Sequence, residues 1–376
     1  MDRRRFIGYG LAGAGMATMG PAICCDNENG GSSIDNIGKY TREALFYKLT
    51  PRGARCELCP NNCTVTEIRR GDCKTKVLQN GKLLTQAYGN PFYVNTEKPE
   101  ERSLYHFFPG SDMMSIGTAG CTLQCLYCSV SEVSQNGPAE VPHKQLFPAE
   151  VIASCKKHTI GQLAFTYTEP VAFYEYMLDT ASLAKQQGIK TIITSNGYVH
   201  AEPLKKLIPL LDAAVIEVKA FNDNTYLKMT AGTIAPVFET LKMIRGSHVW
   251  LEIYHLLVPG WTDNWELFEK MGKWLVDNGF QETPFHIGRF LPKYRLSQLN
   301  PTSYDDMAKA REVLLKAGVH FVYAAHPADP SGLNTLCQNC HSEVITRNDS
   351  RVLTLPHKPG ICNICGNKIA GIWGQV

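Results

Sequence analysis

Two features that would point to nucleic acid or to a lipid bilayer are missing from the sequence. Lys and Arg total 38 against 35 Asp and Glu in 376 residues, so the formal net charge is only +3, with an isoelectric point near 8.1. This mild balance argues against nucleic acid or an anionic membrane as the main partner. No segment reaches the ~18 strongly apolar residues of a membrane span. Any membrane attachment would therefore depend on an uncleaved N-terminal leader.

The N-terminus resembles an export signal of the twin-arginine type. Arg3, Arg4 and Arg5 precede Phe6 and a glycine-rich, weakly apolar run, and a polar Asn/Gly/Ser stretch follows. We predict a signal and linker over residues 1–45, which would direct the folded protein to export or to a membrane. The alternative is a basic N-terminus ahead of a short helix.

Residues 111–330 show the pattern of a (β/α) barrel core. Short apolar, β-branched runs alternate there with longer helical segments, which predicts βαβ units around a parallel sheet. Because no G-x-G-x-x-G follows the first strand, we favour a full or partial (β/α) barrel over a doubly wound sheet. The predicted strands are 114–117, 163–167, 191–194, 214–218, 250–257, 285–290 and 320–324. Several predicted helices open with the Pro or Ser/Thr/Asn that helix N-termini prefer. The helices begin near Pro148, Pro170, Ala201, Ile234, Asn264 and Thr302.

Cysteine is abundant, and eleven of the fourteen cysteines fall into three tight groups, as metal ligands do. Two of the groups lie in cysteine-rich pieces over residues 46–110 and 331–376, which flank the core. These pieces lack long periodic segments, so we expect a metal or docking on the core to stabilise them.

Each flanking group supplies four thiolates. The C-terminal group predicts a zinc-ribbon-like site, with His341 as an additional or competing ligand. The N-terminal group suits zinc or an auxiliary [4Fe-4S] cluster. Disulfides formed after export are the alternative for both groups. The N-terminal group is Cys56, Cys59, Cys63 and Cys73, and the C-terminal group is Cys337, Cys340, Cys362 and Cys365.

The third group, Cys121, Cys125 and Cys128, follows the first predicted strand with the spacing C-x3-C-x2-C. The C-terminal ends of barrel strands are where such folds place their chemistry. Three thiolates can hold three corners of a [4Fe-4S] cubane and leave the fourth iron without a protein ligand. A small molecule with an amine and a carboxylate can chelate that iron, and an electron from the cluster can then break an adjacent sulfonium C–S bond.

The alternative for this triad is a zinc site, which needs four ligands. Residues 129–142 contain no Cys or His, so His143 or a more distant residue would have to supply the fourth. The triad spacing on a glycine-bordered loop therefore favours the cluster.

With these motifs the chain resembles the radical SAM superfamily. Within it the chain is most similar to the pyruvate formate-lyase-activating-enzyme-like branch, in particular to the AmmeMemoRadiSam system radical SAM enzyme. The resemblance implies reductive cleavage of S-adenosylmethionine (SAM) to methionine and a 5′-deoxyadenosyl radical, which abstracts hydrogen from a substrate. The matching strings are CELCP at 56–60, GTAGCTLQCLYC at 117–128, YTEP at 167–170, KAFN at 219–222, LLVPG at 256–260, PFH at 284–286 and CNICG at 362–366.

The resemblance also implies SAM-binding residues near the first strands. Tyr127 would contact adenine, and Thr168 with Glu169 would contact the methionine end, where a carboxylate suits an ammonium group. Ser195 and Asn196 would line the SAM groove. The structural alternatives are ordinary helix capping, with Thr168 as the cap and Glu169 near the positive helix end, and an ordinary Asn-Gly turn after Ser195.

Two further positions come from later strands. Glu217 and Lys219 lie two residues apart on the fourth strand and so face the same side, at a strand end from which relatives bind SAM. His286 matches a histidine that contacts SAM in related activating enzymes. An internal Glu217–Lys219 ion pair and a buried structural histidine are the alternatives.

The resemblance implies partners as well as cofactors. A one-electron donor of the flavodoxin or ferredoxin type would reduce the cluster, and AMMECR and Memo family proteins would act alongside the enzyme. A glycyl radical enzyme activated by this chain is the alternative, and a non-catalytic iron–sulfur electron carrier or metal scaffold is an alternative of another class. SAM dependence predicts the cytoplasm whereas the leader predicts export, so the localisation stays open.

Overall fold

The computed structural model describes residues 38–324 and 330–374. Residues 1–37 of the predicted signal and linker, with Cys24 and Cys25, lie outside the described residues, whereas Arg42 and Glu43 at its end form a strand. Within the described ranges, none of the helices combines the length and the apolar character needed to cross a membrane.

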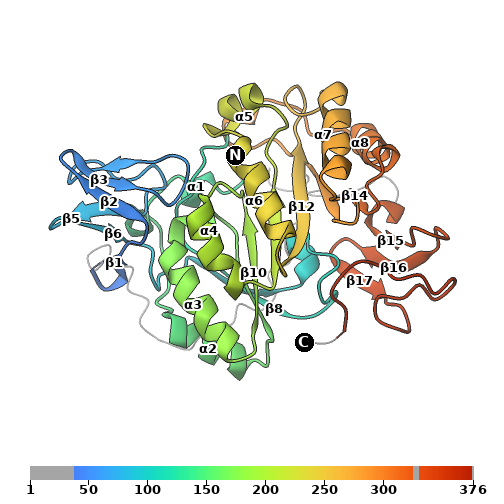
Figure 1. Ribbon diagram of the computed structural model, residues 1–376, viewed down its shortest axis with the longest axis horizontal. Helices are drawn as coiled ribbons and strands as arrows, with labels where there is room; N and C mark the ends of the chain where they lie inside the picture. The colour runs from blue at the N-terminus through green and yellow to red at the C-terminus, as the bar shows by residue number, and fades with distance from the viewer. Residues whose placement is uncertain (1–37, 325–329, 375–376) are drawn as a thin grey trace, which may run out of the picture.

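The core is one eight-stranded sheet in which strands follow one another in chain order (Figure 1). Seven of these strands, β8 to β14, are parallel, and β7 pairs with β8 in the antiparallel direction at one edge. This sequential order is that of a barrel rather than of a doubly wound sheet, and the two edge strands are β7 and β14. The strands are β7 Tyr93–Glu97, β8 Met113–Gly117, β9 Gln162–Phe165, β10 Lys190–Ser195, β11 Ala213–Glu217, β12 Trp250–Leu257, β13 Phe285–Arg289 and β14 Val322–Ala324.

Helices connect the successive parallel strands and cover one face of the sheet, as α3, α4 and α6 show in Figure 1. The predicted fold is thereby confirmed in its partial form, an open (β/α) barrel. The helices are α1 Ser131–Ser134, α2 Pro148–Lys157, α3 Tyr174–Gln186, α4 Ala201–Leu207, α5 Asp223–Thr230, α6 Ala235–Arg245, α7 Trp265–Asp277 and α8 Tyr304–Ala317. Short 3-10 turns occur at η2 Pro99–Arg102, η3 Pro138–Glu140, η4 Pro170–Phe173, η5 Ile208–Leu210, η6 Tyr294–Leu296 and η7 Pro330–Leu333.

The observed elements differ from the predicted ones where a local conformation overrides the apolar pattern. The second parallel strand ends at Phe165 and not at residue 167, because Tyr167 has a φ of 74° that no strand continues. The last helix begins at Tyr304, since the hydroxyl of Ser303 accepts a hydrogen bond from the Asp306 N–H and caps it. Helix α5 and strand β7 were not predicted.

The two faces of the sheet bury different residues. The face under the helices carries Ile116, Phe165, Ile193 and Ile216 in the main core. The opposite face is apolar at its start, where five strand residues pack against Leu104, Phe107 and Phe108. Those strand residues are Met113, Ala164, Ile192, Ala213 and Val215. At the C-terminal ends of the strands the side chains on this face are polar, so a functional site can form there.

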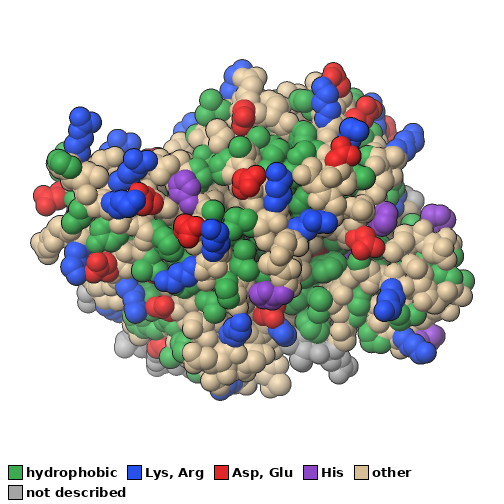
Figure 2. Space-filling model, viewed as in Figure 1, with side chains coloured by type: hydrophobic (Ala, Val, Ile, Leu, Met, Phe, Trp, Pro, Cys, Tyr) green, Lys and Arg blue, Asp and Glu red, His purple; other side chains and the backbone are tan. Residues whose placement is uncertain are grey.

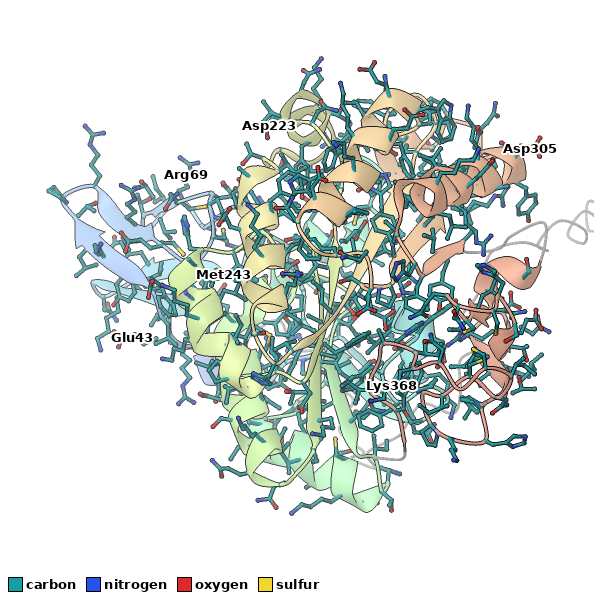
Figure 3. The ribbon with its side chains drawn as sticks, turned by 45° about the vertical axis from the view of Figure 1, so that its right-hand side comes forward. Glu43, Arg69, Asp223, Met243, Asp305 and Lys368 are labelled. Atoms are coloured by element: carbon teal, nitrogen blue, oxygen red, sulfur yellow. The ribbon has the colours of Figure 1, made fainter. Side chains whose placement is uncertain are left out.

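Small antiparallel sheets flank the core on both sides, with Arg69 labelled on the N-terminal piece and Lys368 on the C-terminal piece in Figure 3. On the face that Figure 2 shows, basic and acidic side chains are interspersed. The N-terminal sheets consist of β1 Arg42–Glu43, β6 Lys82–Thr85 and β5 Lys76–Gln79, and of β2 Tyr47–Thr50, β3 Gly53–Cys56 and β4 Thr64–Val65. The C-terminal sheet consists of β15 Thr335–Leu336, β16 Glu343–Asn348 and β17 Arg351–Thr354.

The C-terminal piece docks on the barrel through backbone and buried polar contacts. Ile372 exchanges backbone hydrogen bonds with the segment around His106 and Phe108. The guanidinium of Arg347 donates to the carbonyl of Tyr105 at 2.9 Å and lies over the Tyr105 ring. His106 itself is fully buried, with Nδ1 at 2.6 Å from the carbonyl oxygen of Ala370 and Nε2 at 2.5 Å from the hydroxyl of Tyr323.

Because His106 is buried, we expect the protein to lose stability in mild acid. Burial lowers the pKa of His106 from 6.5 to about 4, so between these values the unfolded chain binds a proton that the folded chain does not. Stability that is present above pH 6.5 is therefore lost as the pH falls toward 4. Since one pKa unit corresponds to ~1.4 kcal/mol, this loss is limited to about 3 kcal/mol.

We expect the urea midpoint of the wild-type chain to fall more steeply between pH 7 and pH 5 than that of His106→Gln. Tryptophan fluorescence at a series of pH values measures both midpoints. If the two urea midpoints fell equally with pH, His106 would not contribute to the loss of stability in acid.

Candidate functional site

The Cys121–Cys128 loop leaves the C-terminal end of β8 and is held by backbone hydrogen bonds. The N–H groups of Gln124 and Leu126 donate to the carbonyls of Thr230 and Met229, at the end of α5. Figure 3 shows Asp223, at the start of this helix, at one end of the barrel. The loop is therefore fixed over the C-terminal strand ends, although α5 itself gave no clear signal in the sequence.

The three cysteines of this loop are free, and Cys125 and Cys128 lie close enough to Cys121 to act on it electrostatically. Cys125 is buried, whereas Cys121 and Cys128 are half-buried. Cys121 Sγ accepts from the N–H of Leu123 at 3.4 Å, and Cys128 Sγ lies 3.1 Å from the hydroxyl of Ser134. Burial raises the pKa of Cys121 and of Cys125; the Glu169 carboxylate raises that of Cys121 further, whereas the Lys219 cation opposes the rise at Cys125. Three neighbouring soft donors on one rigid loop fit a [4Fe-4S] cluster.

Glu169, Ser195 and Asn196 meet next to Cys121. The Glu169 carboxylate accepts hydrogen bonds from Val171 N–H at 3.0 Å, from the Ser195 hydroxyl at 2.8 Å and from Asn196 N–H at 2.8 Å. Burial raises the pKa of Glu169, while these hydrogen bonds oppose the rise. The amide Nδ2 of Asn196 reaches toward Cys121 Sγ at 3.8 Å. The structure thus brings the predicted second- and third-strand residues to the cysteine triad.

The cap at the start of this helical turn is Glu169 and not Thr168. Glu169 Oε1 accepts from Val171 N–H at the start of η4, whereas the Thr168 hydroxyl donates to the carbonyl of Thr118. Thr168 therefore joins the end of β9 to the cysteine loop. A carboxylate can accept about four hydrogen bonds. Glu169 accepts three, so one acceptor position stays open for a ligand.

Glu217 and Lys219 lie beside Tyr127 and Cys125. Their side chains form an ion pair with an Nζ–Oε2 distance of 2.5 Å, which is the internal pair considered as an alternative. Burial disfavours the Lys219 cation, but the Glu217 carboxylate outweighs this effect and raises the pKa of Lys219. Lys219 Nζ also lies 5.7 Å from the centre of the Tyr127 ring. Lys219 is therefore a buried cation at the edge of the triad.

His286 contacts Glu252, Tyr105 and Tyr323. It stands in one row of the sheet with Glu217, Tyr254 and Tyr323, so it shares their level on the sheet. Its Nε2 lies 2.6 Å from Glu252 Oε2, a carboxylate that also accepts from the N–H groups of residues 105 and 106. The contacts of His286 therefore connect it to the segment that docks the C-terminal piece.

Sequence reasoning missed several residues that complete the site. Thr122 accepts from Asn196 Nδ2 at 3.1 Å. Tyr226 of α5 is buried close to Lys219, and its hydroxyl, like that of Tyr127, has no hydrogen-bond partner within the described ranges. No spacing rule identifies these residues, because the turn of α5 back over the cysteine loop brings Tyr226 there.

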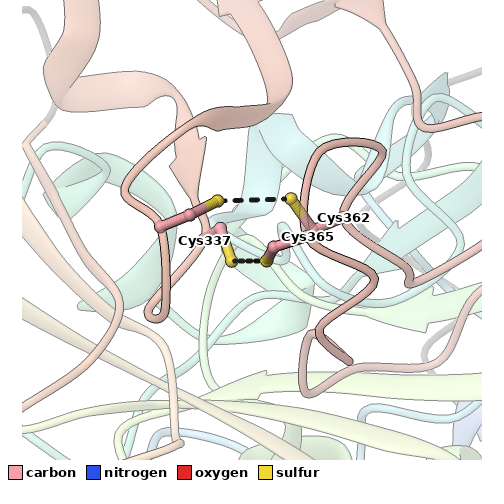
Figure 4. A group of neighbouring side chains, drawn as sticks. Cys337, Cys362 and Cys365 are labelled. Carbon is pink, nitrogen blue, oxygen red and sulfur yellow. Dashed lines mark hydrogen bonds between the residues drawn. The ribbon is translucent and has the colours of Figure 1, made fainter.

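The C-terminal cysteines form a tight tetrathiolate. The four sulfur atoms lie within 4.8 Å of one another, with Cys337 and Cys365 at 3.6 Å and Cys340 and Cys362 at 3.7 Å (Figure 4). Four thiolates about 2.3 Å from a zinc ion would stand about 3.8 Å apart at the corners of a tetrahedron. The donor set therefore fits zinc, and the exposed His341 is not part of it. A disulfide would need about 2.05 Å between sulfurs, and all twelve cysteines in the described part of the chain are free.

The chain is similar to several known proteins and to one family model. The family model of the radical SAM superfamily matches residues 115–271. An uncharacterized protein of Methanocaldococcus jannaschii is 34% identical over 331 residues, which cover 87% of this chain and 98% of that protein. The pyruvate formate-lyase 1-activating enzyme of Escherichia coli is 24% identical over 53% of this chain and 87% of its own length. Among solved structures, Streptococcus suis SuiB bound to precursor peptide SuiA aligns with a TM-score of 0.45 and 12% identity, over 60% of this chain and 50% of SuiB.

The chain belongs to the radical SAM superfamily, in its pyruvate formate-lyase-activating-enzyme-like branch. It is a SAM-dependent iron–sulfur enzyme, and its cofactors are a [4Fe-4S] cluster and SAM.

Proposed function

We propose that the enzyme binds SAM at the C-terminal ends of β8 to β11, against a cluster held by Cys121, Cys125 and Cys128, and abstracts a hydrogen atom from a protein partner. The observation that carries this assignment is the convergence of two polar groups on one cysteine loop. Glu169, Ser195 and Asn196 form the group beside Cys121, and Glu217 with Lys219 forms the group beside Cys125 and Tyr127. When bound, the reduced cluster supplies the electron that splits SAM into methionine and a 5′-deoxyadenosyl radical.

The chain's own residues orient SAM and exclude water. The acceptor position left on Glu169 suits the ammonium group of the methionine end, and Lys219 offers a cation to its carboxylate. The Tyr127 ring supplies an apolar face for adenine, and its buried hydroxyl is available to donate. Leu123, Tyr226 and Ala119 are nearly inaccessible to solvent around the loop, which protects a reactive radical from water and stray hydrogen donors.

The likeness to activating enzymes supports an electron donor and a polypeptide substrate that gives up a hydrogen atom to the 5′-deoxyadenosyl radical. A donor of the flavodoxin or ferredoxin type fits the one-electron step. Action alongside AMMECR and Memo family proteins is our leading assignment for the partner. Activation of a glycyl radical enzyme is the second candidate, favoured by the similarity to the Escherichia coli enzyme. Incubation with each candidate under reducing anaerobic conditions separates them, because only the glycyl radical enzyme would gain a stable radical signal.

Lys219 provides a test of the SAM site that does not require the substrate. We expect Lys219→Met to raise the Kd for SAM at least about tenfold, because it removes a buried cation and leaves the Glu217 carboxylate unpaired. Lys219→Arg should restore part of the affinity. Equilibrium binding of SAM to the reconstituted proteins gives the three values.

Lys190 offers a matched control. It pairs with Asp212 at 2.9 Å at the start of β10, at the opposite end of the same sheet. Lys190→Met should therefore leave SAM affinity within roughly twofold of wild type. Equal losses in the two methionine variants would contradict the placement of SAM at Lys219.

A further inference from the structure

The N-terminal cysteines surround a cavity of their own. Cys56 ends β3, Cys59 and Cys63 follow on the next loop, and Cys73 returns to them from ten residues farther on. All four side chains line one pocket, together with Leu58, Asn61, Lys76, Thr122 and Val171 among others. The fold therefore gathers four thiols from a stretch of eighteen residues around one space.

This pocket lies largely inside the protein and is not a surface groove. Cys56, Cys59 and Cys73 are each less than a tenth exposed. Asp72 N–H donates to Cys63 Sγ at 3.4 Å. Lys76 places a buried ammonium at the wall, paired with the equally buried Glu175 at 2.6 Å. A buried cation and a backbone donor beside four thiols are the surroundings expected of an anionic metal–thiolate centre.

The spacing of the thiols separates this group from the zinc-like C-terminal set. Within the ranges the structure describes, the thiols that gather within 4.8 Å of one another are those of Cys337, Cys340, Cys362 and Cys365. Among the described residues, neither the N-terminal thiols nor those of the Cys121 loop, where we place the SAM-cleaving cluster, form such a compact group. A cubane holds its thiolates farther apart than a single zinc ion does.

The segment that carries the N-terminal cysteines also contacts the loop that carries the cysteine triad. Asn61 Nδ2 donates to the carbonyl of Thr122 at 2.7 Å. Gly120, which precedes Cys121, has a φ of 102°, and a Cβ at this position would lie 2.5 Å from the carbonyl oxygen of Cys73. Only glycine permits this approach, so the backbone of one cysteine group rests on that of the other.

We propose that Cys56, Cys59, Cys63 and Cys73 bind a second iron–sulfur cluster of the four-thiolate [4Fe-4S] class, next to the cluster that cleaves SAM. The proposal concerns metal content and holds whether or not the enzyme turns over, so its test is independent of SAM cleavage.

The test is the iron and labile-sulfide content of the full chain after anaerobic reconstitution. We expect about eight iron atoms per wild-type chain and about four in the triple variant Cys121→Ala/Cys125→Ala/Cys128→Ala, with a [4Fe-4S] Mössbauer signature in both. Adding Cys59→Ala and Cys63→Ala to the triple variant should remove the remaining iron. Zinc content serves as the folding check, because about one zinc per chain at the distant C-terminal site should persist in all three proteins.

The opposite results are equally clear. About four iron atoms in the wild-type chain, or a triple variant without iron that keeps its C-terminal zinc, would overturn the proposal. So would a second zinc per chain that disappears in Cys59→Ala/Cys63→Ala. The wild-type count decides the question even if a variant fails to fold.

Discussion

Replacing Cys125 by alanine is expected to reduce the formation of 5′-deoxyadenosine from SAM to the level of cluster-free protein, a loss of at least about a thousandfold. Cys125 is the central and most buried thiol of the triad, and Lys219 and Tyr127 lie beside it. Two remaining thiols leave a second iron without a protein ligand, so the cluster loses its defined open position. Liquid chromatography of the products after dithionite reduction measures the loss.

Cys155 provides the matched control for this variant. It is fully buried, and its thiol contacts Met114 Sδ at 3.4 Å, outside all three cysteine groups. Cys155→Ala should keep the iron content and SAM cleavage, with at most a moderate loss of stability from the removed core atom. A Cys125→Ala protein that still cleaved SAM at the rate of Cys155→Ala would refute the ligand assignment.

Removal of zinc should unfold the C-terminal piece while the barrel stays folded. The β15–β17 sheet is small, so most of its stability should come from the tetrathiolate, since structural zinc contributes about 10–16 kcal/mol of binding free energy in small domains. Cys362→Ser should therefore lose about one zinc per chain and become sensitive to limited proteolysis after about residue 330. Metal analysis and mass spectrometry of the fragments report the two effects.

His341 is the control within the same loop, because it is exposed and lies outside the tetrathiolate. His341→Ala should keep its zinc and its resistance to protease. Resistance of zinc-free Cys362→Ser would instead show that docking through Arg347 and Ile372 is sufficient to hold the piece together.

The parallel strands were predictable because each is a short apolar run buried on both faces. The alternation with helices carries the topology as well, since parallel neighbours need crossover connections. Strand β7 was missed because its residues are half-buried and polar at the sheet edge, YVNTE, and it pairs in the antiparallel direction. Tyr167 ended β9 early through a left-handed backbone conformation, which side-chain pattern does not reveal.

The parts of the site whose residues lie close together in the sequence were predictable. Cys121, Cys125 and Cys128 lie within eight residues, and each C-x2-C unit is shorter still. The contacts of Asn196 with Thr122 and of His286 with Glu252 join residues that lie 74 and 34 positions apart, so only the fold defines them. Glu169 shows the limit of pattern reasoning, because the same carboxylate caps a helical turn and faces the proposed SAM site.

Reduction of the reconstituted wild-type chain in the presence of SAM tests the central claim most directly. With dithionite under anaerobic conditions, we expect methionine and 5′-deoxyadenosine to form in equal amounts and SAM to change the electron paramagnetic resonance spectrum of the reduced cluster. The assignment of this chain as a SAM-cleaving enzyme would be contradicted if the cluster were intact and reduced, SAM left its spectrum unchanged, and neither product formed.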